Sequence, residues 1–138
     1  MLDVADPTEN DAKMVNPESA LFSQATSELV YLVTAMGGEA ETAAGLAGVG
    51  DLYGTCRAGR NSRMGRLLGQ GLTYDEARKK MARDTIEGAD LARTIGPTLR
   101  DMIARKQLDA ERLPLTEAIL RVLCDGEVFS FDFAAPRG

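Results

Sequence analysis

The spacing of apolar residues predicts helices along most of this chain and gives almost no sign of strands. Between residues 16 and 38 apolar side chains recur every three or four residues, which places them on one face of a helix. These residues are Leu21, Ala25, Leu29, Leu32 and Met36. Asn16 suits the N-cap of this helix, Pro17 its first position and Gly37 a left-handed C-terminal cap. Because runs of β-branched residues are scarce, we expect an all-α fold.

Further helical stretches bring the expected total to about seven helices. They span residues 41–46, 61–68, 73–83, 88–107 and 114–125. Thr73 and Glu76 have the spacing of a capping box, which marks a helix start. The Gly96-Pro97 pair is expected to break or kink residues 88–107, with two shorter helices favoured over one, because proline removes a backbone donor and clashes with the preceding turn. The alternating phenylalanines after residue 128 are expected to form a docked tail rather than a strand.

One compact domain is the default for 138 residues of which 44% are hydrophobic. We expect residues 16–138 to form it, and residues 1–15, which are polar and rich in turn residues, to be a linker or a severed connection to another domain. The formal net charge of -5 argues against a nucleic-acid surface, which needs clustered lysines and arginines without an acidic excess. Membrane insertion and secretion have no support, because no long apolar run occurs.

The chain has two cysteines and no histidine. Cys56 and Cys124 lie far apart without metal-ligand spacing, so we interpret them as reduced thiols of a cytoplasmic protein, with Cys56 a small buried side chain. The absence of histidine excludes an imidazole acid or base, a serine–histidine triad and the common zinc sites, and no metal site is expected. Any proton transfer would use Lys, Asp, Glu, Tyr or Cys.

A glycine-rich segment followed by a basic one contains most of the chemically useful side chains. Segment 45–56 frames an aspartate with glycines, and segment 59–65 begins with Gly-Arg-Asn. The side chains of interest belong to Asp51, Thr55, Arg60 and Asn61. Together they offer a carboxylate, a hydroxyl, a guanidinium and an amide, which suit a small ligand with phosphate and hydroxyl groups.

Four arginines form a local basic cluster on this acidic chain, at positions 57, 60, 63 and 66. Such a cluster indicates a small anionic ligand rather than a polyanion. For Arg63 and Arg66 the alternative is a solvated helix face.

The glycines at positions 48, 50 and 54 superficially imitate a dinucleotide-binding loop. That loop requires a preceding strand inside a strand–helix–strand unit, whereas alanines precede it here and no second strand follows, so we reject this interpretation. The glycines instead let helices turn and approach each other closely, and we expect them to bring Asp51 to the floor of a cleft.

These segments resemble the substrate-binding signature of the nicotinamide-dependent glycerol-3-phosphate dehydrogenases, in their C-terminal helical domain. The resemblance runs from about Asn16 to Gly126, and Leu113–Ala118 is similar to the family's closing Pro-Ile-Thr-Glu-Ala helix start. It implies a fold similar to the 6-phosphogluconate dehydrogenase C-terminal-domain-like helical fold. The activity it implies is hydride transfer between NAD(P)H and dihydroxyacetone phosphate or sn-glycerol 3-phosphate, in glycerol-3-phosphate metabolism and phospholipid biosynthesis.

The resemblance also implies roles for individual residues. It places four of them at the substrate, namely Thr55, Gly59, Arg60 and Asn61. Within this group, the resemblance implies that Arg60 and Asn61 hold the phosphate. It implies that Asp51 contacts the substrate and a lysine that is catalytic in the family. It also implies that Arg60 and Glu87 contact the cofactor.

The chain departs from the family pattern at the expected proton donor. The family's helical domain opens with Asn-x-Lys-Ala-Ala-Leu, whose lysine donates the proton, but here Glu18 stands in place of that lysine and Gln24 in place of the arginine that follows it. We therefore name Lys13, carried on the linker, as a candidate catalytic donor. The alternative is a solvated Lys13 in a protein that is catalytically impaired or uses a lysine from another domain.

A nicotinamide cofactor needs a parallel sheet, and this chain shows no strands to build one. NAD or NADP would therefore be bound mainly by an absent N-terminal nucleotide-binding domain, the expected partner, and the isolated chain is expected to be inactive. A second copy of the chain is a further candidate partner, in a homodimer. The alternative function is a non-catalytic helical domain that binds a small phosphate ester or mediates oligomerisation.

Overall fold

The computed structural model describes the backbone of residues 9–133 and the side chains of residues 17–133. This part of the chain contains seven α-helices, a π-helical turn and a 3-10 turn, without a strand. The elements in order are α1 (Glu9–Ala35), α2 (Ala40–Ala44), η1 (Leu46–Gly50), α3 (Asp51–Thr55), α4 (Arg60–Gly69), α5 (Tyr74–Lys80), α6 (Glu87–Ala104), η2 (Ala110–Arg112) and α7 (Pro114–Asp125). The all-α prediction is confirmed, and no helix in the described part is long and apolar enough to cross a membrane.

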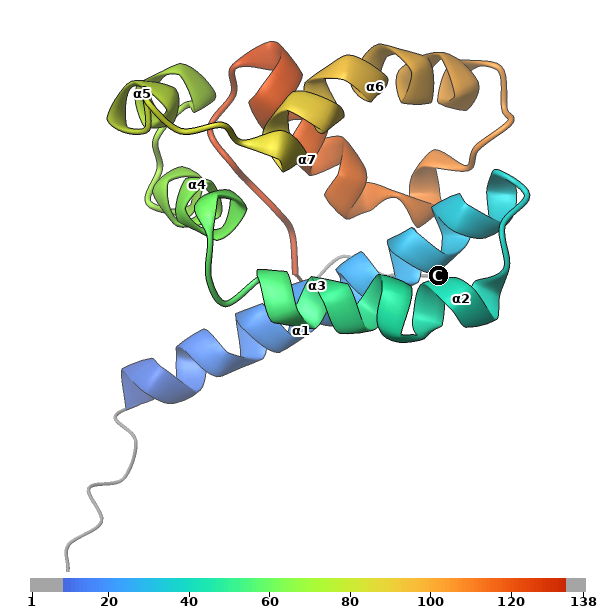
Figure 1. Ribbon diagram of the computed structural model, residues 1–138, viewed down its shortest axis with the longest axis horizontal. Helices are drawn as coiled ribbons and strands as arrows, with labels where there is room; N and C mark the ends of the chain where they lie inside the picture. Colours follow the sequence, from blue (N-terminus) through green and yellow to red (C-terminus); the bar gives the residue numbers. More distant parts are fainter. Residues whose placement is uncertain (1–8, 134–138) are drawn as a thin grey trace, which may run out of the picture.

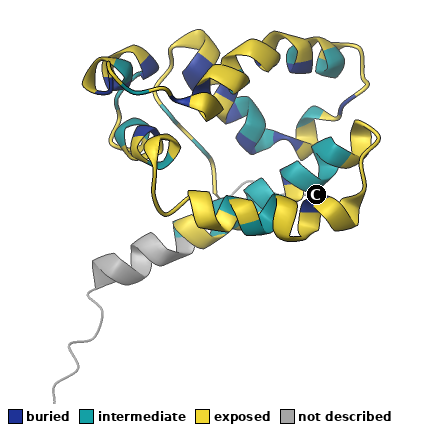
Figure 2. Ribbon diagram, in the orientation of Figure 1, coloured by how far each residue is buried: buried dark blue, intermediate teal, exposed yellow. Residues whose placement is uncertain are grey.

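The helices form two groups that meet at α7. The segment α2–η1–α3 folds back along α1, while α6 lies beside α7 and α4 beside α5 (Figure 1). Helix α7 contacts both α1 and α6, so it joins the two groups. The buried residues lie mainly where α5, α6 and α7 face one another, whereas α2 and α3 are largely exposed (Figure 2).

Two apolar clusters fill this interior. One lies between α4, α5, α6 and α7, and includes the fully buried Met81 and Ile86. The other lies where α6 and α7 meet α1, and Leu113 and Leu120 are buried in it against Leu32. Since α6 and α7 contribute to both clusters, they form the centre of the fold.

Helix α1 begins earlier than the sequence predicts. Its first residue is Glu9 rather than a residue after an N-cap at Asn16, and Pro17 lies inside it. Glutamate, alanine, lysine and methionine in residues 9–16 favour a helix, which extends it towards the N-terminus. Proline inside a helix removes a single backbone hydrogen bond, and here the helix continues past it. The boundary between a linker and a domain at residue 16 stays a prediction.

Helix α6 is also continuous, so the predicted break at Gly96-Pro97 is wrong. A Cβ on Gly96 would lie 2.9 Å from Sγ of Cys124 and 3.1 Å from Cδ2 of Leu120, both on α7. The missing side chain lets α6 and α7 pack closely at this point. We infer that this packing stabilises the helix across the proline, which tertiary contacts can do against a local preference.

The remaining predicted boundaries lie within about three residues of the observed ones, whereas α3 was not predicted and α5 ends at Lys80 rather than at residue 83. Thr73 and Glu76 form the complete capping box at the start of α5. Pro114 is the first residue of α7, and Gly126 ends that helix in the left-handed conformation with φ of 72°. After α7 the described tail forms no strand, and Phe129 packs against the cluster between α4 and α7.

A buried carboxylate on α1 caps the start of α7. The Glu28 side chain is 2% exposed, and its two oxygens accept hydrogen bonds from the backbone N–H groups of Leu115 (2.9 Å) and Thr116 (2.7 Å). Nε2 of Gln24 donates a third bond to the same carboxylate (2.7 Å). The first N–H groups of a helix have no partner within it and carry the positive end of its dipole, so a carboxylate is a favourable partner there.

We expect Glu28→Ala to lower the free energy of unfolding by about 3 kcal/mol, because hydrogen bonds to a charged group contribute ~1.5–3 kcal/mol and the freed N–H groups stay buried. Glu28→Gln keeps one acceptor oxygen and should lose less. Urea unfolding followed by circular dichroism measures both. Glu18→Gln, an exposed change on the same helix, is the control, and an equal loss there would contradict the assignment.

An ion pair between α6 and the end of α7 predicts a dependence of stability on pH. Arg100 forms two hydrogen bonds with Asp125, of 2.8 and 2.7 Å, and they lower the pKa of the Asp125 carboxyl below its ordinary value. A carboxyl whose pKa is lower in the folded than in the unfolded state stabilises the folded state at pH values above the unfolded pKa. This contribution is lost as the pH falls through the folded pKa. We expect Asp125→Asn to flatten the fall in Tm that thermal melts at decreasing pH show for the native chain.

Candidate functional site

The predicted substrate residues Arg60 and Asn61 open helix α4, directly after a short loop. Oγ of Ser62 donates a hydrogen bond to the carbonyl of Cys56 (3.0 Å), which closes this loop against the helix. Gly59, the residue before α4, has φ of +99°, a conformation that favours glycine. The predicted role of Gly59 at the substrate therefore has a backbone reason, because it turns the chain into α4.

The structure separates the four clustered arginines into two kinds. Three of them have a partner within the described residues. These are Arg57 over the ring of Tyr53, Arg63 beside Asp84 and Arg66 on Oγ of Ser62. The guanidinium of Arg60 is exposed and makes no hydrogen bond or ion pair with any described residue. It is thus the arginine of the cluster whose donors are all available to an anion.

Asn61 joins the start of α4 to the start of α6. Its Oδ1 accepts a hydrogen bond from the backbone N–H of Gly88 (3.0 Å), and its Nδ2 has no partner within the described residues. Glu87, the first residue of α6, is exposed beside this contact. The structure therefore joins the start of α4 to the start of α6, with Arg60 and Glu87 each adjacent in sequence to one of the two bonded residues.

Asp51 and Thr55 lie on α3, one helical turn apart and on the same face. Oγ1 of Thr55 donates to the carbonyl of Asp51 (2.9 Å), and the Asp51 carboxylate has no partner within the described residues. Both side chains are exposed. The expectation that Asp51 lies at the floor of a cleft is therefore wrong for this chain. No hydrogen bond or ion pair between described residues links them to Arg60.

The glycine-rich segment forms the π-helical turn η1 and the start of α3. A Cβ on Gly48 would overlap the carbonyl of Ala43 in α2, so this glycine is needed for the close turn. Helix α2 precedes the segment and α3 follows it, whereas a dinucleotide-binding loop lies between a strand and a helix.

The region of the expected proton donor differs from the sequence prediction. The backbone of Lys13 lies within α1 rather than in a linker, and its side chain lies outside the described residues. Glu18 is exposed on α1. Gln24, where the resemblance expects arginine, supports the buried Glu28 instead.

The predicted environment of Cys56 is also wrong, and two important contacts were missed. Cys56 is exposed rather than buried, because it lies in the loop before α4, and its Sγ donates to the carbonyl of Tyr53 (3.2 Å). The missed contacts are those of Glu28 with α7 and of Gly88 with Asn61. No local pattern signals them, since the partners are far apart in the sequence.

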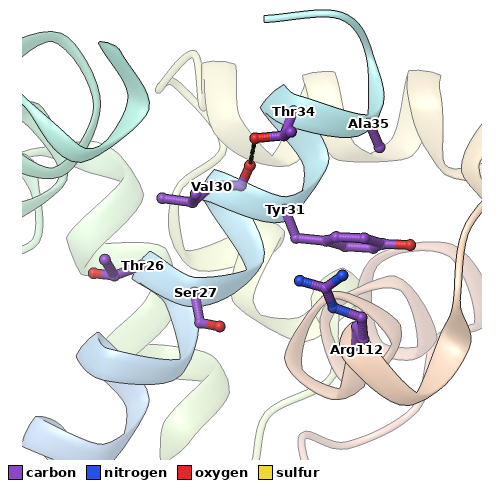
Figure 3. Close-up of a pocket in the computed structure, with 7 residues that line it drawn as sticks. All are labelled: Thr26, Ser27, Val30, Tyr31, Thr34, Ala35 and Arg112. Atoms are coloured by element: carbon purple, nitrogen blue, oxygen red, sulfur yellow. Dashed lines mark hydrogen bonds between the residues drawn. The ribbon is translucent and has the colours of Figure 1, made fainter. Parts of the chain in front are cut away.

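A hollow with a volume of about 450 Å³ lies along α1, away from these residues (Figure 3). Its lining consists of Thr26, Ser27, Val30, Tyr31, Thr34, Ala35 and Arg112. The guanidinium of Arg112 lies 3.9 Å from the centre of the Tyr31 ring. Neither this hollow nor any acidic or thiol cluster in the described residues suggests a metal site.

Comparison of the sequence with known proteins identifies a family. A family model described as the NAD-dependent glycerol-3-phosphate dehydrogenase C-terminus matches residues 10–130. The NADP(+)-dependent glycerol-3-phosphate dehydrogenase of Archaeoglobus fulgidus is 34% identical over 116 residues, which cover 84% of this chain and 33% of that protein. A glycerol-3-phosphate dehydrogenase (NAD(P)+) of Bacillus licheniformis is 37% identical over 114 residues, 81% of this chain and 31% of its own length.

The chain therefore spans about a third of the length of these curated relatives. No solved structure gave a significant match.

Proposed function

The chain belongs to the family of NAD-dependent glycerol-3-phosphate dehydrogenase C-terminal domains, and we propose that it supplies the substrate-binding part of such a dehydrogenase. The substrate is sn-glycerol 3-phosphate or dihydroxyacetone phosphate, and the reaction is reversible hydride transfer. The observation that carries the proposal is that the Arg60 guanidinium and the Asn61 amide nitrogen, on consecutive residues at the start of α4, have no partner within the described residues.

In this proposal Arg60 and Asn61 bind the substrate phosphate. A guanidinium offers two parallel donors to phosphate oxygens, and the amide adds a neutral donor. Gly59 presents both residues by turning the chain into α4. Binding the end of the substrate that does not react places the carbonyl carbon in a fixed position, which lowers the entropic part of the barrier.

Asp51 and Thr55 are the proposed contacts to the substrate hydroxyls. Their common face on α3 is exposed in this chain, so it is available to a ligand or to another domain. The unpaired Asp51 carboxylate would also orient an ammonium group that donates the proton. For that donor, Lys13 on α1 and a lysine outside this chain both stay candidates, whereas an ionised Glu18 would repel the alkoxide that forms.

NAD or NADP would supply the hydride. The described part of this chain has no sheet to hold a dinucleotide, so most of the cofactor would be bound outside it. Two residues here fit a cofactor that reaches the junction of α4 and α6, because Arg60 and Glu87 lie exposed at the adjacent helix starts. Their proposed task is to bind and orient the nicotinamide end.

One alternative function competes with this proposal. A non-catalytic helical domain that binds a phosphate ester is less favoured, since the relatives that match this chain are dehydrogenases. A nucleotide-binding domain as partner follows from the proposal itself. Dimerisation, a cytoplasmic location and a part in phospholipid biosynthesis stay predictions from the sequence.

We expect Arg60→Ala to weaken the binding of sn-glycerol 3-phosphate to the isolated chain by tenfold or more. The lost contact is a charge-assisted hydrogen bond, which contributes ~1.5–3 kcal/mol, and each 1.4 kcal/mol is about tenfold in affinity. Chemical-shift changes in a ¹⁵N-labelled chain, titrated with sn-glycerol 3-phosphate, measure the affinity.

Glycerol, which lacks the phosphate, should leave the spectra of both forms unchanged. Arg105→Ala is the matched control, because it removes the same charge at the opposite end of α6. If the native chain does not respond to sn-glycerol 3-phosphate, or if Arg105→Ala weakens binding as much as Arg60→Ala, the assignment of the phosphate site is wrong.

A further inference from the structure

Helix α6 lacks a capping residue of its own. The residue at its N-cap position is Ile86, whose side chain cannot accept a hydrogen bond, and the first backbone N–H groups of a helix need an acceptor from outside. Asn61 provides it from α4, through the bond between its Oδ1 and the N–H of Gly88. A residue of the proposed phosphate site thus also caps a neighbouring helix.

This contact fixes which end of the Asn61 amide is available. A side-chain amide has one oxygen, which accepts, and one nitrogen, which donates. The N–H of Gly88 can bond only to the oxygen, so the amide nitrogen is left with its two hydrogens unused among the described residues. Without the contact the amide could turn either end towards a ligand, and a phosphate binds only the donor end.

Gly88 leaves room for this arrangement. A Cβ at its position would lie 2.9 Å from Oδ1, 3.1 Å from Cγ and 3.2 Å from Nδ2 of Asn61. The closest of these separations is shorter than real Cβ contacts allow, so any larger residue would push the amide away from the start of α6.

We propose that Gly88 is a positioning residue for phosphate recognition: its N–H holds the Asn61 carbonyl oxygen, and its missing side chain lets the Asn61 amide nitrogen face the substrate phosphate beside Arg60. The inference rests on the proposed function and extends it to a residue with no ligand contact of its own. It also links the two ends of the site, because Gly88 directly follows the proposed cofactor residue Glu87.

The test compares Gly88→Ala with the native chain in the same ¹⁵N titration with sn-glycerol 3-phosphate. We expect the variant to bind about tenfold more weakly, the effect of one hydrogen bond to a charged group. The hydrogen exchange of the residue 88 amide should become faster, since its acceptor is displaced. Alanine favours a helix over glycine, so the variant should stay folded.

Gly69→Ala is the matched control, since it is the same substitution in a helix with open space around it. It should leave the affinity and the exchange of the residue 88 amide unchanged. Asn61→Asp separates the two tasks of Asn61, because a carboxylate still accepts from Gly88 but has no donor. We expect it to keep the residue 88 amide protected while it abolishes binding of sn-glycerol 3-phosphate.

The outcomes are distinct. If Gly88→Ala binds as tightly as the native chain, or if Asn61→Asp exposes the residue 88 amide, the positioning role is wrong and the proposed phosphate site stands. If the native chain shows no response to sn-glycerol 3-phosphate, the proposed function fails, and the positioning role fails with it.

Discussion

The fold depends on the buried carboxylate of Glu28. Its hydrogen bonds to two N–H groups of α7 fix α1 across the start of that helix, and α7 in turn packs along α6. A buried carboxylate is costly unless its charge is matched, and the dipole of a helix start and its N–H donors, which have no partner within the helix, provide that match. The Glu28 carboxylate therefore depends on the N–H groups of α7 to match its charge, and these N–H groups depend on Glu28 for an acceptor. Among the described side chains of α1, Glu28 is the one that is fully buried, and the apolar packing of Tyr31 and Leu32 against the second cluster holds the same helix.

Helix starts in this domain are capped in two ways, and the difference explains what the sequence could predict. At α5 the acceptor is Thr73, adjacent in the chain, and the capping box was recognised from two residues. At α6 and α7 the acceptors are Asn61 and Glu28, which belong to other helices. Such caps exist only after the helices have packed, so no local pattern reveals them. The all-α class, by contrast, follows from local spacing and was predicted correctly, as were both limits of α7.

The incorrect predictions have the same physical origin. Proline at position 97 is a local signal to end a helix, but the packing of α6 against α7 at Gly96 outweighs it. The motif singled out Arg60 and Asn61, but it did not show that the other three arginines have partners. Arg57 and Arg66 each contact a side chain four residues earlier in the chain, whereas the partner of Arg63 is Asp84, which is distant in the sequence. Exposure of Asp51 and Cys56 likewise depends on which surfaces this chain covers and which it leaves open.

The proposed phosphate site lies where two helices start, so its geometry depends on how those two helices pack. The amide of Asn61 belongs to α4 but is held by the backbone of α6, so a small shift of one helix relative to the other would turn the donor away from the phosphate. The packing that fixes this relation is the apolar cluster between α4 and α7, in which Met64 of α4 and Ala89 of α6 are both buried. Met64 follows Asn61 by less than one turn, and Ala89 follows Gly88 directly. Close packing resists small displacements, so the interior that stabilises the domain also sets the orientation of its proposed phosphate donors.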